Sequence, residues 1–370
     1  VGILGISNGW NDYRSIDCSK KKWKGDVRMK KNALKFFNKL KENKWLCGLL
    51  SILMCLLVSC QSAEDEIGTK NSSDVKVIGV SLPTTQLVYR EAMKELVDQT
   101  YGNGAVPGIE IRIYDANGSL EQQSQHILEM VDDQVDGIIL VPGSTEQCLP
   151  AVEYAHSKHV PVITVDNRIF ESSAEQVISF VGADHYDMGK KAVKLFLELL
   201  EENFSEQETW NIIQLSGIPE ASGTIDRGQA ISETLAGNRR INLLGSYDGE
   251  FSVENARSVM EDCLNIFPKI DGVICQNDNM AEGCYQALEK AGLAGKIVVV
   301  GIDGQSTTLS LIKQGGIHGT VLQQPSMILD GIDLLCRYLD GETLEKNYYS
   351  QTYPITQQNA GYHLDNGLSW

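Results

Sequence analysis

The chain has 370 residues and carries 49 acidic against 32 basic side chains, for a formal net charge of −17. This length is too great for one ordinary domain and suggests two lobes. The acidic excess argues against a nucleic-acid partner and against charge-driven attachment to anionic lipid, because phosphate backbones and lipid headgroups repel a polyanion.

The first 59 residues differ from the rest of the chain in charge. Residues 1–59 hold 12 basic and 4 acidic side chains, which leaves 20 basic and 45 acidic ones for residues 60–370. A basic stretch that begins at Met29 precedes Trp45–Val58, an uncharged apolar run of 14 residues. This run is shorter than the roughly 20 residues that span a bilayer, and it lies where the hydrophobic region of a secretory signal would lie. We assign no structure to residues 1–28, which form an upstream extension.

The apolar run ends in Leu57-Val58-Ser59-Cys60. This sequence resembles the lipobox of bacterial lipoproteins, and the resemblance implies that Cys60 is acylated and that residues 1–59 are removed. The alternative is a plain signal or an anchoring helix in which Cys60 is incidental. Residues 61–74 are polar and have almost nothing to bury, so residues 60–74 are predicted to be a lipidated cysteine and a flexible tether.

From residue 75 onward, short β-branched runs alternate with longer amphipathic ones, which predicts an α/β fold with parallel sheets. The predicted strands are 75–80, 109–114, 137–141, 160–165, 177–181, 210–215, 241–247, 272–276, 297–302 and 319–322. The predicted helices are 92–100, 122–133, 148–159, 188–202, 224–236, 252–267, 281–291 and 306–314. The pattern restarts near residue 184, so we expect two similar Rossmann-like lobes.

The two halves also resemble each other in sequence. Each contains an Asp-Gly that opens an apolar strand, at Asp136 and Asp271, and each has a later strand that ends in an acid, at Asp166 and Asp303. Ligands of open parallel sheets bind outside the carboxyl ends of the strands. Two facing sheets would therefore place Asp166 and Asp303 on opposite walls of one cleft.

Five cysteines follow residue 60, at positions 148, 263, 275, 284 and 336. No pair has the C-x-x-C spacing of a zinc or redox site, so we expect buried thiols and no metal.

Polar side chains follow the predicted strands, as in Asp166-Asn167-Arg168, Gln276-Asn277-Asp278, Asp303-Gly304-Gln305 and Gln323-Gln324, and Asp226-Arg227 adds an arginine. Carboxylates accept hydrogen bonds, an arginine donates several, and amides do both. A buried polyol needs such a mixed set, and Phe251 could cover the apolar face of a sugar ring. Taken singly, each residue could instead cap a helix or fix a loop.

Residues 75–360 resemble the periplasmic sugar-binding proteins of the ribose, galactose and xylose group, and most closely its ribose-binding members. The resemblance rests on stretches that run in family order along the chain, namely Val160-Pro161-Val162-Ile163-Thr164-Val165-Asp166, Asp226-Arg227-Gly228, Gly249-Glu250-Phe251, Gln276-Asn277-Asp278-Asn279-Met280-Ala281, Val299-Val300-Gly301-Ile302-Asp303-Gly304 and Thr320-Val321-Leu322-Gln323-Gln324-Pro325.

The resemblance implies a fold of two lobes joined by three crossings, near Ala183, Gln323-Gln324 and Thr356. The N-terminal lobe would then comprise 75–183 and 324–356, and the C-terminal lobe 184–323 and 357–370. It also implies roles for individual side chains. The positions that hydrogen-bond the sugar in that family match Asp166, Arg227, Asn277, Asp303 and Gln323, and the position that stacks on it matches Phe251.

Two departures from the ribose-binding pattern concern the ligand. Asn167 stands where ribose-type sequences have Arg, and Arg168 follows it. Pro83–Tyr89 replaces their Asn-Pro-Phe-Phe motif, so we count Thr85 and Gln86 as candidate contacts, with Tyr89 or Gln86 in place of one aromatic residue. The expected ligand is a pentose, a hexose or a related polyol.

The resemblance implies a monomeric, lipid-anchored binding protein on the outer face of the bacterial cytoplasmic membrane, attached only through its lipid. It would deliver its sugar to the transmembrane permease subunits of an ABC transporter and need no cofactor. The alternative is a sensory binding protein that presents a sugar or autoinducer to a chemoreceptor or sensor kinase. An enzyme is a further alternative because facing acids can act as acid and base, but the sequence has no nucleophile elbow and no phosphate loop.

Overall fold

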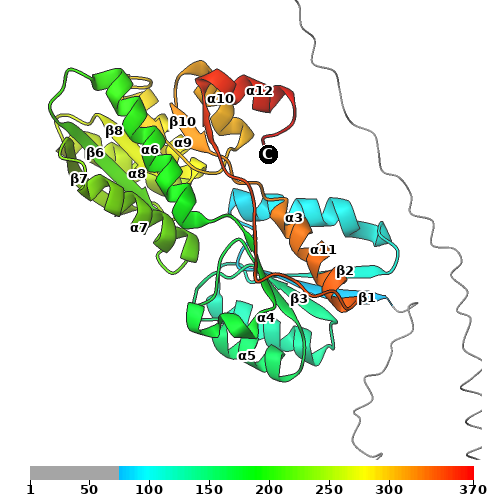
Figure 1. The fold of residues 1–370 in the computed structure, drawn as a ribbon. Helices are drawn as coiled ribbons and strands as arrows, with labels where there is room; N and C mark the ends of the chain where they lie inside the picture. The colour runs from blue at the N-terminus through cyan, green and yellow to red at the C-terminus, as the bar shows by residue number, and fades with distance from the viewer. Residues whose placement is uncertain (1–74) are drawn as a thin grey trace, which may run out of the picture. The chain divides into compact units, whose positions relative to one another are not determined.

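The computed structural model describes residues 75–370, which form two α/β lobes, each built on a six-stranded sheet (Figure 1). The predicted fold class is confirmed. The predicted signal segment, the proposed lipidation site at Cys60 and the tether of residues 61–74 lie outside the described residues. Among residues 75–370, no helix is both long enough and apolar enough to cross a membrane.

The first sheet has the strand order β11-β5-β4-β3-β1-β2, and all of its strands are parallel. Its strands are β1 (Lys76–Leu82), β2 (Ile109–Asp115), β3 (Gly137–Leu140), β4 (Val162–Val165), β5 (Ser179–Gly182) and β11 (Asn347–Tyr349). The helices that flank it are α3 (Val88–Tyr101), α4 (Leu120–Asp132), α5 (Leu149–Ser157) and α11 (Met327–Leu339). Helices α3 and α11 pack on one face of this sheet, and α4 and α5 pack on the other.

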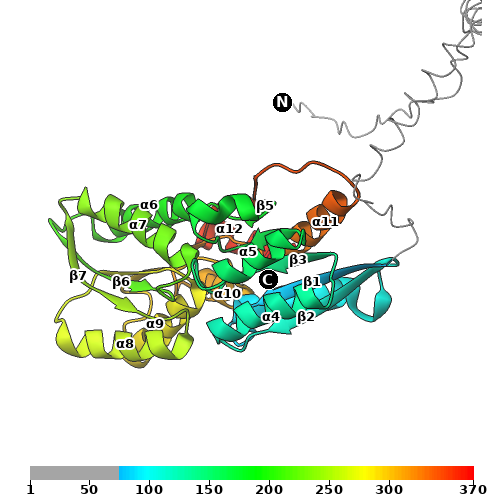
Figure 2. The same ribbon diagram turned by 90° about the horizontal axis from the view of Figure 1, so that it is seen from below.

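The second sheet has the order β12-β10-β9-β8-β6-β7, and only β12 is antiparallel. Its strands are β6 (Trp210–Ser216), β7 (Ile241–Asp248), β8 (Gly272–Cys275), β9 (Val298–Val300), β10 (Gly319–Val321) and β12 (Pro354–Thr356). The helices are α6 (His185–Phe204), α7 (Ser222–Ala236), α8 (Val253–Ile266), α9 (Asp278–Lys290), α10 (Ser306–Gln314) and α12 (Gln357–Asp365). Figure 2 shows α6 and α7 on one side of this sheet and α8 and α9 on the other.

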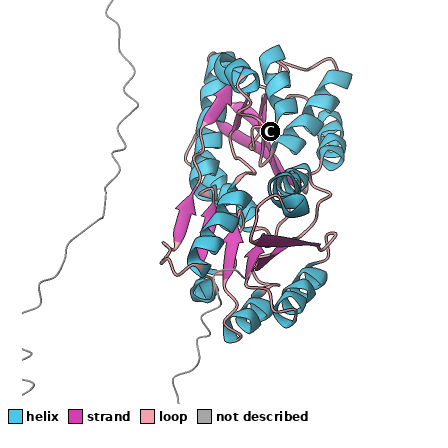
Figure 3. Cartoon of the chain, turned by 90° about the vertical axis from the view of Figure 1, so that its right-hand side faces the viewer, coloured by secondary structure: helices cyan, strands magenta, loops and turns pink. Residues whose placement is uncertain are grey.

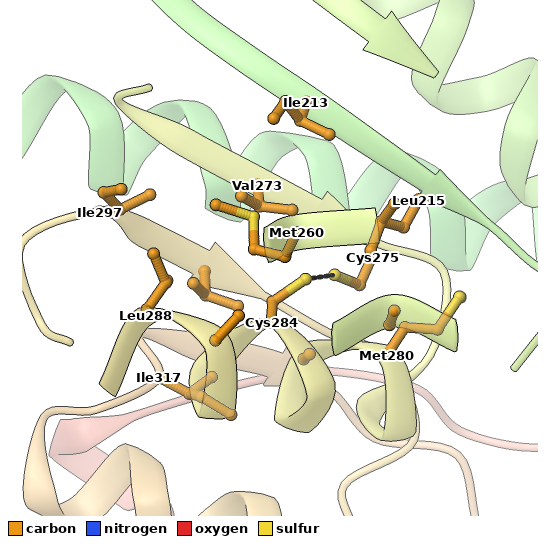
Figure 4. Packing of buried hydrophobic residues seen from close by; sticks show 14 of the residues in the cluster. Ile213, Leu215, Met260, Val273, Cys275, Met280, Cys284, Leu288, Ile297 and Ile317 are labelled. Atoms are coloured by element: carbon orange, nitrogen blue, oxygen red, sulfur yellow. Dashed lines mark hydrogen bonds between the residues drawn. The ribbon is translucent and has the colours of Figure 1, made fainter. Parts of the chain in front are cut away.

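Both sheets are covered by helices on their two faces, as parallel strands require (Figure 3). The central strands β3, β4 and β8 accordingly read as continuous, mostly apolar runs, and they are buried throughout. Figure 4 shows the core between β6, β8 and α9, where the Cys275 and Cys284 sulfur atoms lie 3.8 Å apart. All five cysteines of the described residues are free and buried, which confirms the expected buried thiols.

The chain passes between the sheets after β5, after β10 and after β11. The third crossing lies earlier than the expected position near Thr356. Residues Pro354–Thr356 form β12, which pairs with β10 of the second sheet, so these three residues do not belong with the first lobe. The short strands β11 and β12 and the helices α11 and α12 were not among the predicted elements.

Candidate functional site

Carboxyl ends of strands from both sheets bring polar side chains together at one place. Asp166 follows β4 and Asn277 follows β8, while Gln323 lies just beyond β10. Asp303 follows β9 and its backbone pairs with Leu322. Asp166 and Asp303 have positive φ angles of 64° and 138°, which are rare for residues with side chains and are typical of functional sites.

Asp166 lies at the centre of a buried network. One of its carboxylate oxygens is 2.6 Å from Nη2 of Arg90, and the other accepts a hydrogen bond from the Gln323 amide. Burial alone would raise the pKa of this carboxyl group, but the positive charges of Arg90 and Arg227 lower it below its ordinary value. Asp166 is therefore a carboxylate at neutral pH, and it can accept hydrogen bonds but cannot donate them.

Arg227 links the network to the second lobe. It lies on α7 and is only 4% exposed. Its Nη1 donates to the Gln276 carbonyl oxygen at 2.7 Å, and its Nη2 donates to the Gln323 side chain. Its Nε has no hydrogen-bond partner among residues 75–370. The guanidinium thus keeps one buried donor available for a ligand.

Asp303 has a different environment from Asp166. Burial raises the pKa of Asp303 well above its ordinary value, and the carboxyl groups of Asp278 and Asp166 raise it further, although Arg227 acts to lower it. The Asp278 carboxylate accepts hydrogen bonds from the backbone N–H groups of Gly304 and Gln305, the two residues after Asp303, at 2.8 and 2.9 Å. These bonds fix the loop that carries Asp303.

The side chains of this network line a cavity between the lobes with a volume of about 40 Å³. Two aromatic rings complete its wall, Tyr89 from α3 and Phe251 from the loop after β7. The Phe251 ring lies against Gly217, where a Cβ atom would come within 2.0 Å of it. The cavity therefore combines apolar ring faces with buried hydrogen-bonding groups of both kinds, which suits a small neutral polar ligand.

A family model for a periplasmic binding protein domain matches residues 78–343. The chain belongs to the periplasmic binding protein family. It is 30% identical over 294 residues to the xylitol-binding protein of Mycolicibacterium smegmatis, a match that covers 79% of this chain and 80% of that one. It is 26% identical over 285 residues to the ribose import binding protein RbsB of Bacillus subtilis, covering 76% of this chain and 88% of the relative.

A solved structure of a galactofuranose-binding protein has the same fold, with a TM-score of 0.72 and 25% sequence identity over 78% of this chain and 97% of that one. The names of these relatives describe binding proteins and not enzymes. Family membership therefore agrees with the site, whose groups suit the retention of a ligand.

Seven of the ten candidate residues line the cavity of this periplasmic binding protein, namely Asp166, Asn167, Arg227, Phe251, Asn277, Asp303 and Gln323. The side chain of Asn167 also holds the two lobes together. Its Nδ2 donates to the Pro142 carbonyl oxygen in its own lobe, and its Oδ1 accepts from Gly223 N at 3.1 Å in the other.

The structure does not bring Thr85, Gln86 and Arg168 to this cavity. The Thr85 backbone and hydroxyl donate to Asp115, and Gln86 is exposed. Arg168 lines a neighbouring cavity of about 650 Å³, where its guanidinium lies 3.6 Å from the Phe180 ring centroid. The larger cavity is not the better candidate, because it lacks the buried network of acids, amides and arginines.

Sequence reasoning missed Arg90 and His185 and left the role of Tyr89 open. The predicted helix began at residue 92, whereas α3 begins at Val88 and carries both Tyr89 and Arg90 in its first turn. His185 donates its Nε2 hydrogen to the Asp166 carbonyl oxygen at 2.8 Å. Burial and the charge of Arg227 lower the pKa of His185 to about 4, so its ring is neutral. The spacing of four residues between Tyr89, Met93 and Val97 continues the helix back to Tyr89 and could have revealed the earlier start.

Proposed function

We propose that this chain binds a monosaccharide or a related polyol between its lobes and delivers it to the permease of an ABC transporter. The observation that carries the proposal is the buried network in which Gln323 joins Asp166 to Arg227, with each of these side chains at most 5% exposed. Each sugar hydroxyl both donates and accepts, so a carboxylate, an amide and a guanidinium together can satisfy several hydroxyls out of contact with water.

The names of the relatives support this ligand class. The ligands in these names are xylitol, ribose and galactofuranose, which share adjacent hydroxyls on a short carbon chain or small ring. Tyr89 and Phe251 supply ring faces for the C–H surface of such a ligand. A ligand that lacked one of the matched hydroxyls would leave a buried group unpaired, at a cost of about 1 to 3 kcal/mol.

Binding would be coupled to movement of the lobes. The network joins both lobes across a cavity of about 40 Å³, so entry of a sugar requires the walls to separate and then to close on it. A sugar that binds the closed arrangement better than the open one shifts the population toward it, and the permease would read the closed form. The import function in the name of the ribose relative supports a transporter over a sensor as the partner.

The remaining parts of the proposal concern location. Residues 1–59 would direct export, and a lipid on Cys60 would hold the protein on the outer face of the cytoplasmic membrane. The acidic excess of residues 60–370 supports an attachment that does not depend on charge. Radiolabelled palmitate should appear on the wild-type chain and should be absent from Cys60→Ser.

A sugar panel tests the binding function. Isothermal titration of the purified protein with ribose, xylitol, galactose, fructose and inositol should give a saturable heat with at least one member, at one site per chain. The same mixtures should be examined for products, because two acids with opposite pKa shifts are also an arrangement used in acid–base catalysis. Turnover of a sugar would contradict a pure binding role, and a panel without any heat would contradict the ligand class.

A further inference from the structure

The segment that follows α12, residues 366–370, lies against the second crossing between the lobes. The indole Nε1 of Trp370 donates to the carbonyl oxygens of Asp303 and Gln323, at 3.1 and 2.9 Å. The Trp370 carbonyl oxygen accepts from the backbone N–H of Ser306 at 2.8 Å. Figure 1 shows this end of the chain, marked C, between α12 and α3. Two peptide groups that carry cavity side chains are thus held by one indole.

The same indole also contacts the first lobe. The Trp370 ring lies 5.1 Å from the Tyr89 ring, centroid to centroid, at an interplanar angle of 72°. Tyr89 belongs to α3 and lines the cavity, and its hydroxyl donates to the Gln324 carbonyl oxygen at 3.2 Å. Such edge-to-face pairs are among the favoured arrangements of aromatic rings. Trp370 therefore joins residues of the second lobe to the cavity wall of the first.

We propose that Trp370 is a positioning residue for the sugar site and stabilises the closed arrangement of the lobes. The inference rests on the proposed function. Trp370 does not itself line the cavity, so it acts through Asp303, Gln323 and Tyr89. Its ring contact with Tyr89 joins the two lobes in the arrangement that the structure describes. Loss of the indole should thus weaken the binding of every sugar by the same factor, whereas loss of a cavity residue changes the order of preference among sugars.

The test compares the sugar affinities of Trp370→Ala, Trp370→Phe and the full wild-type chain, measured by titration with each sugar that the wild type binds. Trp210→Phe is the matched control, because Trp210 is buried at the start of β6. Trp370→Ala should raise every Kd by about tenfold, and Trp370→Phe, which keeps a ring but loses the N–H donor, by about threefold. Trp210→Phe should leave the affinities unchanged.

A spectroscopic readout distinguishes positioning from general stability. In the chain labelled with 5-fluorotryptophan, the fluorine signal that disappears in Trp370→Phe belongs to Trp370. This signal should shift when sugar is added, and Tyr89→Leu should abolish most of that shift. A purely structural residue would lower the melting temperature with no change in Kd and no sugar-dependent signal.

The outcomes distinguish a protein that binds no sugar from one in which Trp370 does not position the site. A wild-type chain that binds no sugar of the panel overturns the proposed function, and the role of Trp370 with it. If the wild type binds, Kd changes below twofold in both Trp370 variants overturn the positioning role alone. Unequal factors for different sugars also overturn it, because a residue that stabilises the closed arrangement should affect the binding of every sugar equally.

Discussion

Asp166 and Asp303 occupy corresponding strand ends in the two lobes, yet their electrostatic environments are opposite. Both are nearly fully buried, at 4% and 3% exposed. Arg90 and Arg227 outweigh the effect of burial at Asp166 and lower its pKa, whereas burial and two neighbouring acids raise the pKa of Asp303. The repeated fold fixes the positions of the two acids, but the residues contributed by helices decide their charge.

This difference follows from where the cations come from. The first lobe supplies Arg90 from the first turn of α3, directly to Asp166. The second lobe supplies Arg227, which acts on both acids but donates its hydrogen bonds to Gln276 and Gln323. Asp303 therefore depends on a shared cation, while Asp166 also has one that bonds to it. Removing Arg90 and Arg227 in turn should therefore affect Asp166 and Asp303 differently.

The largest effect is expected from Arg227→Ala, because this change removes the cation that both acids share. Two buried carboxyl groups would then face the cavity with less compensation, and breaking such an arrangement costs about 3 kcal/mol or more. Sugar affinity measured by titration should fall by at least about 100-fold while the circular dichroism spectrum is retained. Gln229→Ala on the exposed side of the same helix is the control. Unchanged affinity in Arg227→Ala would contradict the site assignment.

Arg90→Gln should have the next largest effect and should act mainly on Asp166. Loss of a charged hydrogen bond of about 1.5 kcal/mol predicts roughly tenfold weaker sugar binding. The stabilising contribution of a carboxyl group with a lowered pKa is present above its unfolded pKa and is lost as the pH falls through the folded value. Because Arg90→Gln raises that folded pKa toward the unfolded value, Asp166 should contribute less stability at neutral pH, and the acid-induced loss of thermal stability should be smaller than in the wild type.

Melting curves between pH 3 and pH 8 measure this loss. Lys94→Gln is the control, since Lys94 lies on the same helix but forms an exposed pair with Asp98. Identical pH profiles for wild type and Arg90→Gln would show that Arg90 does not determine the charge of Asp166.

The strand-end acids could be predicted from the sequence because they depend on a repeated pattern of apolar strands and following polar residues. Arg90 was missed because α3 begins at Val88, four residues before the predicted start at residue 92, and Arg90 lies in the turn between these two positions. The strands β11 and β12 have three residues each, too few for a periodic signal, and tertiary pairing alone defines them. Trp370 acts through contacts with segments 47 to 281 residues away, which no local pattern records.

Asp303→Asn should stabilise the sugar-free protein, even though it alters a residue of the site. A carboxyl group with a raised folded pKa binds a proton more readily in the native state, so native stability falls as the pH rises from the ordinary value of 3.8 through the raised value. The amide removes this penalty. At pH 8 the sugar-free melting temperature should therefore rise by about 2 °C, although sugar binding weakens.

The comparison with pH 5 makes this test specific, because the gain from Asp303→Asn should be smaller there, where more of the wild-type carboxyl group is protonated. Asp340→Asn, which alters an exposed partner of Lys76, should show no such dependence. A lower melting temperature for Asp303→Asn at both pH values would mean that Asp303 is ionised and stabilising, as Asp166 is.

The smallest effect on binding is expected from Arg168→Ala, even though the sequence places Arg168 next to the first strand-end acid. Its guanidinium lies over Phe180 and donates to Asn347 and Tyr349, at 2.9 and 3.0 Å, so it ties the end of β4 to β11 outside the sugar cavity. The melting temperature should fall by about 2 °C, as expected for one cation–π contact and two exposed hydrogen bonds, while Kd changes less than twofold. A loss of affinity as large as that of Arg90→Gln would show that the arginine after Asp166 reaches the sugar when the ligand is bound. Arg168 and not Arg90 would then be the arginine of the first lobe that matters for sugar binding. The electrostatic difference between Asp166 and Asp303 would depend on Arg168 instead of on Arg90 of α3.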